Sequence, residues 1–124
     1  MNALPLVSVV DDDESIRESL PDLLRELGYA VDVFASGEEF LESEQRKRTR
    51  CLILDVAMPG MSGIELQEEL TRRGQAIPIV FITGQPDEEV RPRVLAAGAV
   101  DYLHKPFHEA ALIRAVNAAV GVAP

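Results

Sequence analysis

Several features that assign proteins to specialised classes are scarce or missing in this sequence. There is one cysteine, Cys51, so no disulfide bond can form within the chain. We expect Cys51 to be a small buried residue at the start of a strand. No apolar run approaches the roughly 18 residues that cross a membrane, and no N-terminal segment resembles a signal peptide. We therefore expect a soluble, cytoplasmic protein that does not act at a membrane.

Positive charge is also scarce, since 12 lysines and arginines face 21 acidic residues and the net charge is −9. A surface of this sign repels a phosphate backbone, so we expect no direct nucleic-acid binding by this chain. The exception is the segment 42–50, whose basic residues are Arg46, Lys47, Arg48 and Arg50. We interpret it as the solvated end of a helix and a loop. The alternative is a docking patch for an acidic partner.

The sequence has the length and composition of one globular domain. Its 124 residues are 47% hydrophobic and 27% charged, which allows a buried core. Short apolar runs alternate with segments of helical periodicity, and runs rich in β-branched residues are typical of strands buried in a parallel sheet. The expected strands are Leu6–Val10, Ala30–Phe34, Cys51–Leu54, Ile77–Ile82 and Val100–Leu103.

Helical signals fill the intervals between these runs. Apolar residues at helical spacing lead to Gly28, which we expect to end the first helix. Pro21 lies inside this helix and is expected to kink it without breaking it. Ser36 and Ser62 are the expected N-caps of the second and third helices, and Glu39 completes a capping-box pattern with Ser36.

The fourth helix is complicated by Pro92. An interior proline removes a backbone hydrogen bond and costs roughly 3 kcal/mol, whereas a proline in the first turn is tolerated. One alternative is a helix that starts at Asp87 and bends at Pro92. The other, which we expect, is a late start near Arg91 after an irregular and mobile segment 85–90.

The alternation of strand and helix, five times over, predicts an α/β three-layer sandwich with a parallel five-stranded sheet. The flavodoxin-like strand order 2-1-3-4-5 is the expected arrangement of (βα)5 units. In such sheets, ligands bind beyond the carboxyl ends of the strands. Polar residues stand at four of these ends: Asp11, Asp12 and Asp13 after the first strand, Asp55 after the third, Thr83 after the fourth and Lys105 after the fifth.

Strands 1 and 3 are neighbours in this order, so Asp11, Asp12 and Asp55 are expected to share a small volume. Carboxylates that close cannot all stay ionised without a cation, and oxygen ligands in a compact site suit Mg²⁺ (or Mn²⁺). Lys105 and Thr83 could then bind an anion. Taken singly, residues here have ordinary roles, and Asp13 is expected to be the N-cap of the first helix. Together they favour a site for a metal and a phosphoryl group.

Motifs in a fixed order and spacing occupy five separated segments: Val9–Asp13, Leu52–Asp55, Met58–Gly63, Ile82–Gly84 and Ala97–Phe107. Together they resemble the receiver domain of two-component response regulators. The FixJ-like branch, whose receivers usually precede a DNA-binding domain, is the most similar. The resemblance covers essentially the whole chain. We therefore expect residues 1–124 to form one receiver domain, either on its own or as the N-terminal part of a longer regulator.

The resemblance implies a role for each acidic residue at the predicted site. Asp55 resembles the phospho-acceptor. Asp12 resembles the direct metal ligand, and Asp11 its partner, acting directly or through water. The backbone carbonyl of Ala57 would complete the protein ligands of the metal.

The resemblance also implies a set of residues that respond to the phosphoryl group. Thr83 is similar to the hydroxyl that moves onto this group, and Lys105 to the lysine that contacts its oxygens. Tyr102 stands where the family has an aromatic residue that changes rotamer. The Lys105–Pro106 peptide bond would be cis.

The implied function is Mg-dependent phosphoryl transfer from a sensor histidine kinase to Asp55. Partner binding would then change through the face made by the fourth helix, fifth strand and fifth helix. The chain would be a signalling module and not an enzyme, with self-phosphotransfer and self-dephosphorylation only. It would control transcription through another domain, and phosphorylation-dependent homodimerisation is a further expectation.

Three alternatives share parts of this pattern. A haloacid-dehalogenase-type phosphohydrolase has a second aspartate two residues after its nucleophile, where this sequence has Ala57. A flavodoxin-like cofactor protein has a phosphate-binding loop after the first strand, where this chain has three acids. A pseudo-receiver acting only as an interaction surface is disfavoured by the complete residue set. Ala57 also departs from the receiver pattern, which commonly has a longer polar side chain there.

Overall fold

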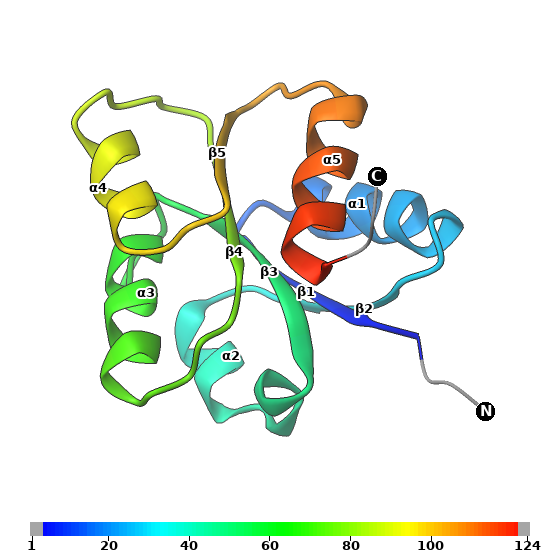
Figure 1. Ribbon diagram of the computed structural model, residues 1–124, viewed down its shortest axis with the longest axis horizontal. Coiled ribbons are helices and arrows are strands. Elements are labelled where there is room, and N and C mark those ends of the chain that lie inside the picture. Colours follow the sequence, from blue (N-terminus) through cyan, green and yellow to red (C-terminus); the bar gives the residue numbers. More distant parts are fainter. Residues whose placement is uncertain (1–3, 122–124) are drawn as a thin grey trace.

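The computed structural model describes residues 4–121 as a five-stranded parallel sheet with helices on both faces. The strand order is β2-β1-β3-β4-β5, so the predicted fold class and strand order are confirmed (Figure 1). The expected domain bounds also include residues 1–3 and 122–124, which lie outside the described part. In chain order the elements are β1 (Leu6–Val10), α1 (Glu14–Glu26), β2 (Ala30–Phe34), α2 (Gly37–Glu42), the 3-10 turn η1 (Glu44–Lys47), β3 (Thr49–Asp55), α3 (Gly63–Arg72), β4 (Ile79–Thr83), α4 (Val90–Ala96), β5 (Asp101–His104) and α5 (Glu109–Val120).

The first three strands follow the apolar runs of the sequence closely. β1 and β2 have the predicted bounds. β3 begins two residues earlier than predicted because Thr49 already pairs with Leu6 of β1. The Thr49 hydroxyl is also hydrogen-bonded to the buried Ser8 hydroxyl at 2.7 Å. At its other end β3 includes Asp55, so the predicted acceptor belongs to the strand itself.

The last two strands start later than their apolar runs. β4 begins at Ile79 and not at Ile77. Pro78 has no N–H for the strand ladder, although its carbonyl accepts the Leu52 N–H at 2.9 Å. β5 is shifted by one residue at each end relative to the prediction. These shifts leave every strand pointing its carboxyl end to the same edge of the sheet.

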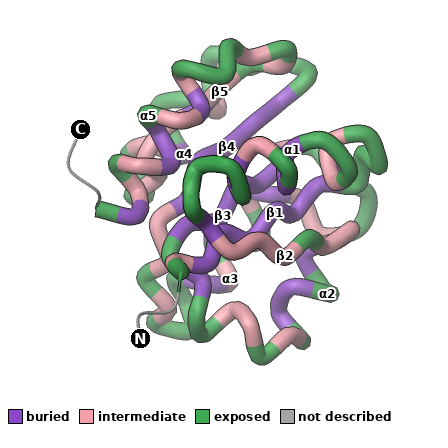
Figure 2. The backbone as a smooth tube through the Cα atoms, turned by 90° about the vertical axis from the view of Figure 1, so that its right-hand side faces the viewer, coloured by how far each residue is buried: buried purple, intermediate pink, exposed green. Residues whose placement is uncertain are grey.

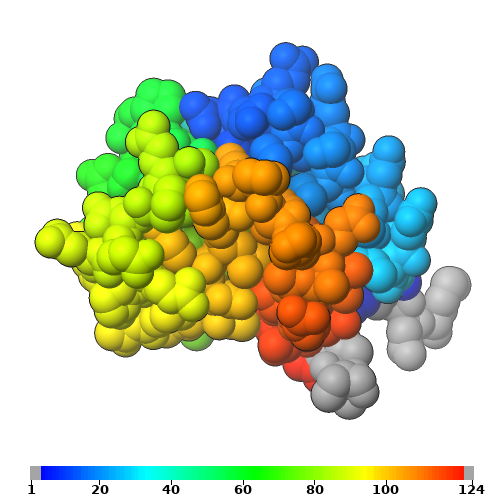
Figure 3. Space-filling model, turned by 90° about the horizontal axis from the view of Figure 1, so that it is seen from above, coloured from blue at the N-terminus to red at the C-terminus, as the bar shows by residue number. Residues whose placement is uncertain are grey.

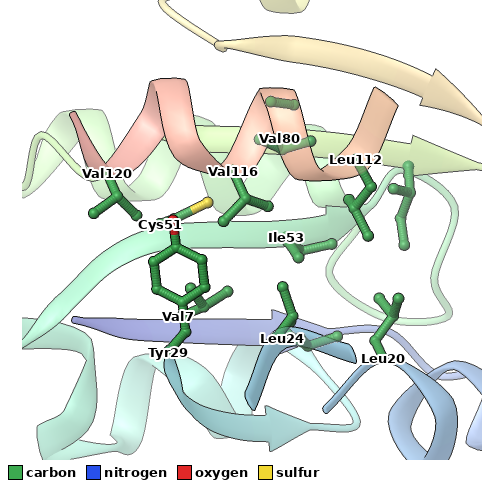
Figure 4. Close-up of a cluster of buried hydrophobic side chains, with 13 residues drawn as sticks. Val7, Leu20, Leu24, Tyr29, Cys51, Ile53, Val80, Leu112, Val116 and Val120 are labelled. Carbon is green, nitrogen blue, oxygen red and sulfur yellow. The ribbon is translucent and has the colours of Figure 1, made fainter. Parts of the chain in front are cut away.

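Two hydrophobic clusters hold the layers together, one on each face of the sheet. Figure 1 shows α1 and α5 on one face, with α2, α3 and α4 on the other. Buried backbone concentrates on the central strands β1, β3 and β4 (Figure 2). Figure 4 shows Leu24 of α1 and Val116 of α5 reaching Ile53 of β3. Cys51 lies in this cluster without exposure, as predicted, and burial raises the pKa of its thiol to about 12.

Side-chain caps begin α2 and α3 at the predicted residues. Ser62 forms a complete capping box with Glu65. Ser36 accepts the Glu39 N–H at 3.1 Å. The Glu39 carboxylate accepts the N–H of Ala35, one residue before the position that a capping box requires. The capping box predicted at Ser36 is therefore only half formed.

The fourth helix starts late, as predicted, at Val90. Pro92 is then its third residue, in the first turn, where a backbone N–H has no partner within the helix. Asp87 organises the preceding turn. Its carboxylate accepts the Glu89 N–H at 2.9 Å, and its carbonyl accepts the N–H groups of Val90 and Arg91. Pro21, by contrast, lies inside α1, and that helix continues through it.

Candidate functional site

The carboxyl ends of β1, β3 and β5 bring the predicted site residues together at one edge of the sheet. Figure 3 looks onto this edge, where the segments that follow β1 (blue), β3 (green) and β5 (orange) lie next to one another. The parallel register explains the convergence. Val10 pairs with Leu54, and Asp55 pairs with Ile82, so the residues that follow these positions emerge at the same height.

Three carboxylates form a compact cluster at this edge. Asp11 is fully buried, Asp55 is 5% exposed and Asp12 is exposed. Each offers one oxygen that lies within 4.8 Å of the others. Oxygen ligands that can close on one point are what hard divalent cations such as Mg²⁺ require. These three carboxylates therefore fit a divalent metal ion. Because Asp12 is exposed, an ion bound to it could also take ligands from outside the protein.

Lys105 supplies the cation of the site from the loop after β5. Its Nζ donates a hydrogen bond to Asp11 Oδ2 at 2.8 Å and lies 3.9 Å from Asp55 Oδ2. The Lys105 N–H donates to the Thr83 carbonyl at 2.7 Å, which fixes this loop against the end of β4. The Lys105–Pro106 peptide bond is cis. One ammonium among three carboxylates leaves the cluster negative, and so able to attract a second cation.

The surroundings of Asp55 in this cluster change the pKa of its carboxyl group. Burial, followed by the charge of Asp11, raises the pKa of the Asp55 carboxyl from 3.8 to about 7. The Lys105 ammonium offsets part of this rise. The ionised pair of Asp11 and Asp55 is therefore costly in the metal-free protein, and a bound cation would remove that cost.

We predict that Asp55→Asn raises the free energy of unfolding of the metal-free protein by about 2 kcal/mol at a pH of about 8. A carboxyl with a raised folded-state pKa costs stability when it ionises. This cost is absent below a pH of about 4 and grows as the pH rises toward 7. The gain in the free energy of unfolding should therefore be smaller at a pH of about 4.5.

Urea unfolding in EDTA at both pH values measures the difference in the free energy of unfolding between Asp55→Asn and the parent. An equal gain at the two pH values would contradict the account, and Asp22→Asn, whose side chain is 86% exposed, is the control.

Thr83 and Tyr102 lie on neighbouring strands, and each is bonded to the loop between β4 and α4. The Thr83 hydroxyl accepts the Gln85 N–H and donates to the Gln85 carbonyl, both at 3.1 Å. The Tyr102 side chain is turned inward, with the residue 5% exposed, and its hydroxyl accepts the Asp87 N–H at 3.1 Å. Both residues therefore hold the same loop.

Two other residues singled out in the sequence stand beside the acid cluster. Ala57 is exposed, and its N–H donates to Asp55 Oδ1 at 3.4 Å. Asp13 is the N-cap of α1, as predicted, and its carboxylate accepts both the N–H and the hydroxyl of Ser15. These bonds hold the pKa of Asp13 below its usual range. Asp13 is thus occupied by the helix and does not join the cluster.

Sequence reasoning missed two residues that shape the site. Arg17 reaches back from α1 and donates to the Asp11 carbonyl at 2.8 Å, which fixes the turn after β1. Gly63 begins α3 directly against the backbone of Asp55, and a methyl group there would overlap the Asp55 carbonyl oxygen. Nothing in the sequence marks Arg17. The position of Gly63 next to the N-cap Ser62 was visible, but its contact with Asp55 needs the folded chain.

The fold and this cluster define a class: a flavodoxin-like α/β protein with acidic residues and a lysine at the carboxyl edge of its sheet. The sequence model of the response regulator receiver domain matches residues 7–117. The chain belongs to the response regulator receiver domain family. Members of this family are receiver domains of response regulators in two-component systems.

Individual relatives agree with this assignment. The chain is 42% identical to the response regulator protein TodT of Pseudomonas putida, over 96% of this chain and 52% of that protein. It is 42% identical to the transcriptional regulatory protein FixJ of Azorhizobium caulinodans, over 93% of this chain and 54% of that protein. The solved structure of the response regulator StyR is 49% identical, covers 96% of this chain and 60% of its own, and superposes with a TM-score of 0.89. The chain spans about half the length of these curated relatives.

Across residues 4–121, no helix combines the length and the apolar character needed to cross a membrane.

Proposed function

We propose that this chain is a phosphorylatable receiver in which Asp55 accepts a phosphoryl group from a phosphohistidine of a sensor histidine kinase. The observation that carries the proposal is the position of the Lys105 ammonium, 2.8 Å from Asp11 and 3.9 Å from Asp55. A lysine between two carboxylates that also lie close to Asp12 suits a site where an anion and a divalent cation bind together. A structural ion pair would need only one of these acids.

In the proposed reaction, an oxygen of the ionised Asp55 carboxylate attacks the phosphorus atom of the phosphohistidine. A P–O bond forms and the P–N bond breaks. The imidazole nitrogen leaves with the bonding electron pair and takes up a proton. Lys105 lies within reach of Asp55 and would neutralise charge on the phosphoryl oxygens, the main contribution that a protein makes to a loose transition state.

The carboxylates of Asp11, Asp12 and Asp55, with the backbone carbonyl of Ala57, would hold Mg²⁺ (or Mn²⁺). The compact set of oxygen ligands and the raised pKa of Asp55 support this assignment. A bound divalent ion supplies charge neutralisation at the phosphoryl oxygens. Asp12, the exposed member, would be the direct ligand, and the buried Asp11 would act directly or through water while it pairs with Lys105.

The proposed response begins at Thr83. Its hydroxyl would turn onto the phosphoryl group and give up its two hydrogen bonds to Gln85. The loop that leads to Asp87 would then shift, and Tyr102 holds that loop through the Asp87 N–H. The face made by α4, β5 and α5 would change its affinity for partners, including a second copy of the chain. This is a two-state element that a local charge biases.

We also propose that residues 1–124 are the receiver part of a longer transcriptional regulator. The length of the curated relatives supports this, since the chain spans about half of TodT and FixJ. The net charge of −9 favours nucleic-acid binding by another part of such a protein and not by this domain.

The experiment that tests the function is phosphoryl labelling of the purified chain by acetyl phosphate. We predict that the chain is labelled with Mg²⁺ present and that EDTA lowers the labelling rate at least about tenfold, because the ion neutralises phosphoryl charge. Phosphate-affinity gel electrophoresis measures the labelled fraction, and re-addition of Mg²⁺ after EDTA is the control. Absence of any labelling with Mg²⁺ would favour the pseudo-receiver alternative.

A further inference from the structure

The helix α4 has little to stabilise its first turn from within. It is seven residues long, and its N-cap residue Glu89 makes no side-chain hydrogen bond to the helix. The first N–H groups of the helix, those of Val90 and Arg91, donate to the carbonyl of Asp87, which precedes the helix. Helices this short are marginal without tertiary contacts. The start of α4 must therefore be held by residues outside it, and β5 is the neighbouring element.

Tyr102 of β5 is the first of these contacts. Its ring packs in the hydrophobic cluster under α2, α3 and α4 and is 5% exposed. Its hydroxyl accepts the Asp87 N–H at 3.1 Å, in the turn that precedes α4. The inward position of Tyr102 and the order of this turn are therefore coupled, since the hydroxyl reaches Asp87 only from the inward rotamer.

Arg91 of α4 makes the return contact and binds Tyr102 twice. Its Nη1 donates to the Tyr102 carbonyl at 3.1 Å, and its guanidinium carbon lies 5.9 Å from the centre of the Tyr102 ring. A cation at this distance over a ring face is attracted by the π system. β5 pairs with β4 alone among the strands at positions 4–121, so a guanidinium can reach the carbonyl from its free side.

Arg93, two residues along the same helix, has different partners from Arg91. Arg93 takes the usual surface partner and pairs with Glu68 at 3.4 Å, both side chains being largely exposed. Arg91 makes no ion pair with any of the described residues, although the chain carries 21 acidic residues. Its guanidinium is directed at the backbone and ring of one residue. A planar fork that both stacks and donates is a property of arginine that lysine lacks.

We propose that Arg91 is a positioning residue that holds Tyr102 in its inward rotamer before any phosphoryl group binds. The hydroxyl of Tyr102 orders the start of α4, and Arg91, carried by α4, retains Tyr102 in turn. The two contacts support each other across the β4–α4 loop that also carries Gln85, the partner of Thr83. The inference rests on the proposed function only in assigning this pair to the switch. The contacts themselves are independent of phosphorylation.

Loss of Arg91 should release Tyr102. A cation–π contact and one hydrogen bond together are enough to shift the ratio of inward to outward rotamers by roughly tenfold. We expect Arg91→Ala to make the Tyr102 ring solvent-accessible for a substantial fraction of the time. Arg91→Lys keeps the charge but loses the fork, so it should give an intermediate shift. Arg93→Ala removes an arginine from the same short helix and should leave Tyr102 unchanged.

The chain is well suited to the measurement because it has two tyrosines and no tryptophan. Incorporation of fluorotyrosine gives two ¹⁹F signals, which Tyr29→Phe assigns. Broadening of each signal by a soluble paramagnetic probe reports its solvent access, without phosphodonor. We expect the broadening of the Tyr102 signal to rise several-fold in Arg91→Ala, less in Arg91→Lys, and not at all in Arg93→Ala. Tyr29, 4% exposed, is the internal control for the fold.

Other outcomes of the fluorotyrosine experiment would overturn the proposal. Equal Tyr102 signals in Arg91→Ala and Arg93→Ala would overturn it. If the Tyr29 signal of Arg91→Ala also broadens, this variant has a loosened fold, and Arg91→Lys is then the test. Unchanged broadening of the Tyr102 signal in Arg91→Lys would overturn the proposal. Acetyl phosphate labelling of the same samples separates this result from the proposed function. Labelling without release of Tyr102 refutes the role of Arg91 alone, and release without labelling refutes the phosphoryl function alone.

Discussion

Asp55→Asn should lower labelling by acetyl phosphate and Mg²⁺ by a factor of about 100 or more, because an amide oxygen does not serve as the nucleophile. Asparagine has nearly the same size and shape as aspartate, so the packing at the end of β3 is kept. The variant should also be the more stable protein without metal, since it removes a buried carboxyl of raised pKa. Loss of labelling therefore cannot be attributed to loss of the fold. Quantified phosphate-affinity gels give the rates.

Asp13→Asn is the matched control for this experiment. Asp13 follows β1 at the same edge of the sheet and has the same charge, but its carboxylate accepts hydrogen bonds from Ser15 as the cap of α1. Asparagine caps helices as well as aspartate does, so the fold should be unaffected and labelling should persist. Undiminished labelling of Asp55→Asn would refute the assignment of the acceptor. Equal losses of labelling in Asp55→Asn and Asp13→Asn would show that labelling depends only on the negative charge at this edge of the sheet.

Gly63→Ala should destabilise the protein by about 3 kcal/mol, which is roughly a hundredfold in the folding equilibrium. The added methyl group would overlap the Asp55 carbonyl oxygen and touch the backbone of Val56. Backbone atoms cannot rotate away as a side chain does, so α3 or the end of β3 must move. For a chain of this length we expect the melting temperature to fall by about 10 °C. Calorimetry or thermal circular dichroism measures the fall.

Gly84→Ala is the control for Gly63→Ala. A methyl group at Gly84 meets no atom within 4 Å, and the backbone there is not in the left-handed region. This variant should keep the stability of the parent to within about 0.5 kcal/mol. A Gly63→Ala protein that melts at the parent temperature would contradict the close packing of α3 against Asp55. If Gly63→Ala still folds at low temperature, its rate of labelling by acetyl phosphate should also fall there, because the shift of the backbone displaces the Asp55 carboxylate.

The strands and the acid cluster were predictable because each follows from local pattern and sheet topology. β1 and β2 have the bounds of their apolar runs. Once the order β2-β1-β3-β4-β5 is assumed, Asp11 and Asp55 must emerge side by side, and the structure places them so. The late start of α4 was predictable for the same reason, since the effect of Pro92 on the backbone is local.

The remainder depends on contacts between distant parts of the chain. The Asp87 N–H finds the Tyr102 hydroxyl 15 residues away, and no periodicity in the sequence indicates that pairing. Arg91 looks like any arginine on an exposed helix until its guanidinium is seen over Tyr102. The half-formed capping box at Ser36 shows the limit of a local rule, because Glu39 bonds to Ala35 N–H in its place.

The most direct test of the central claim is to locate the phosphoryl group chemically. The chain is labelled with acetyl phosphate and Mg²⁺ and then reduced with borohydride, which converts an aspartyl phosphate to homoserine. Tandem mass spectrometry of the digested chain reads the modified position. The account predicts homoserine at position 55 and at no other acid. Homoserine at position 11, 12 or 13, or none in a fully labelled sample, would contradict it.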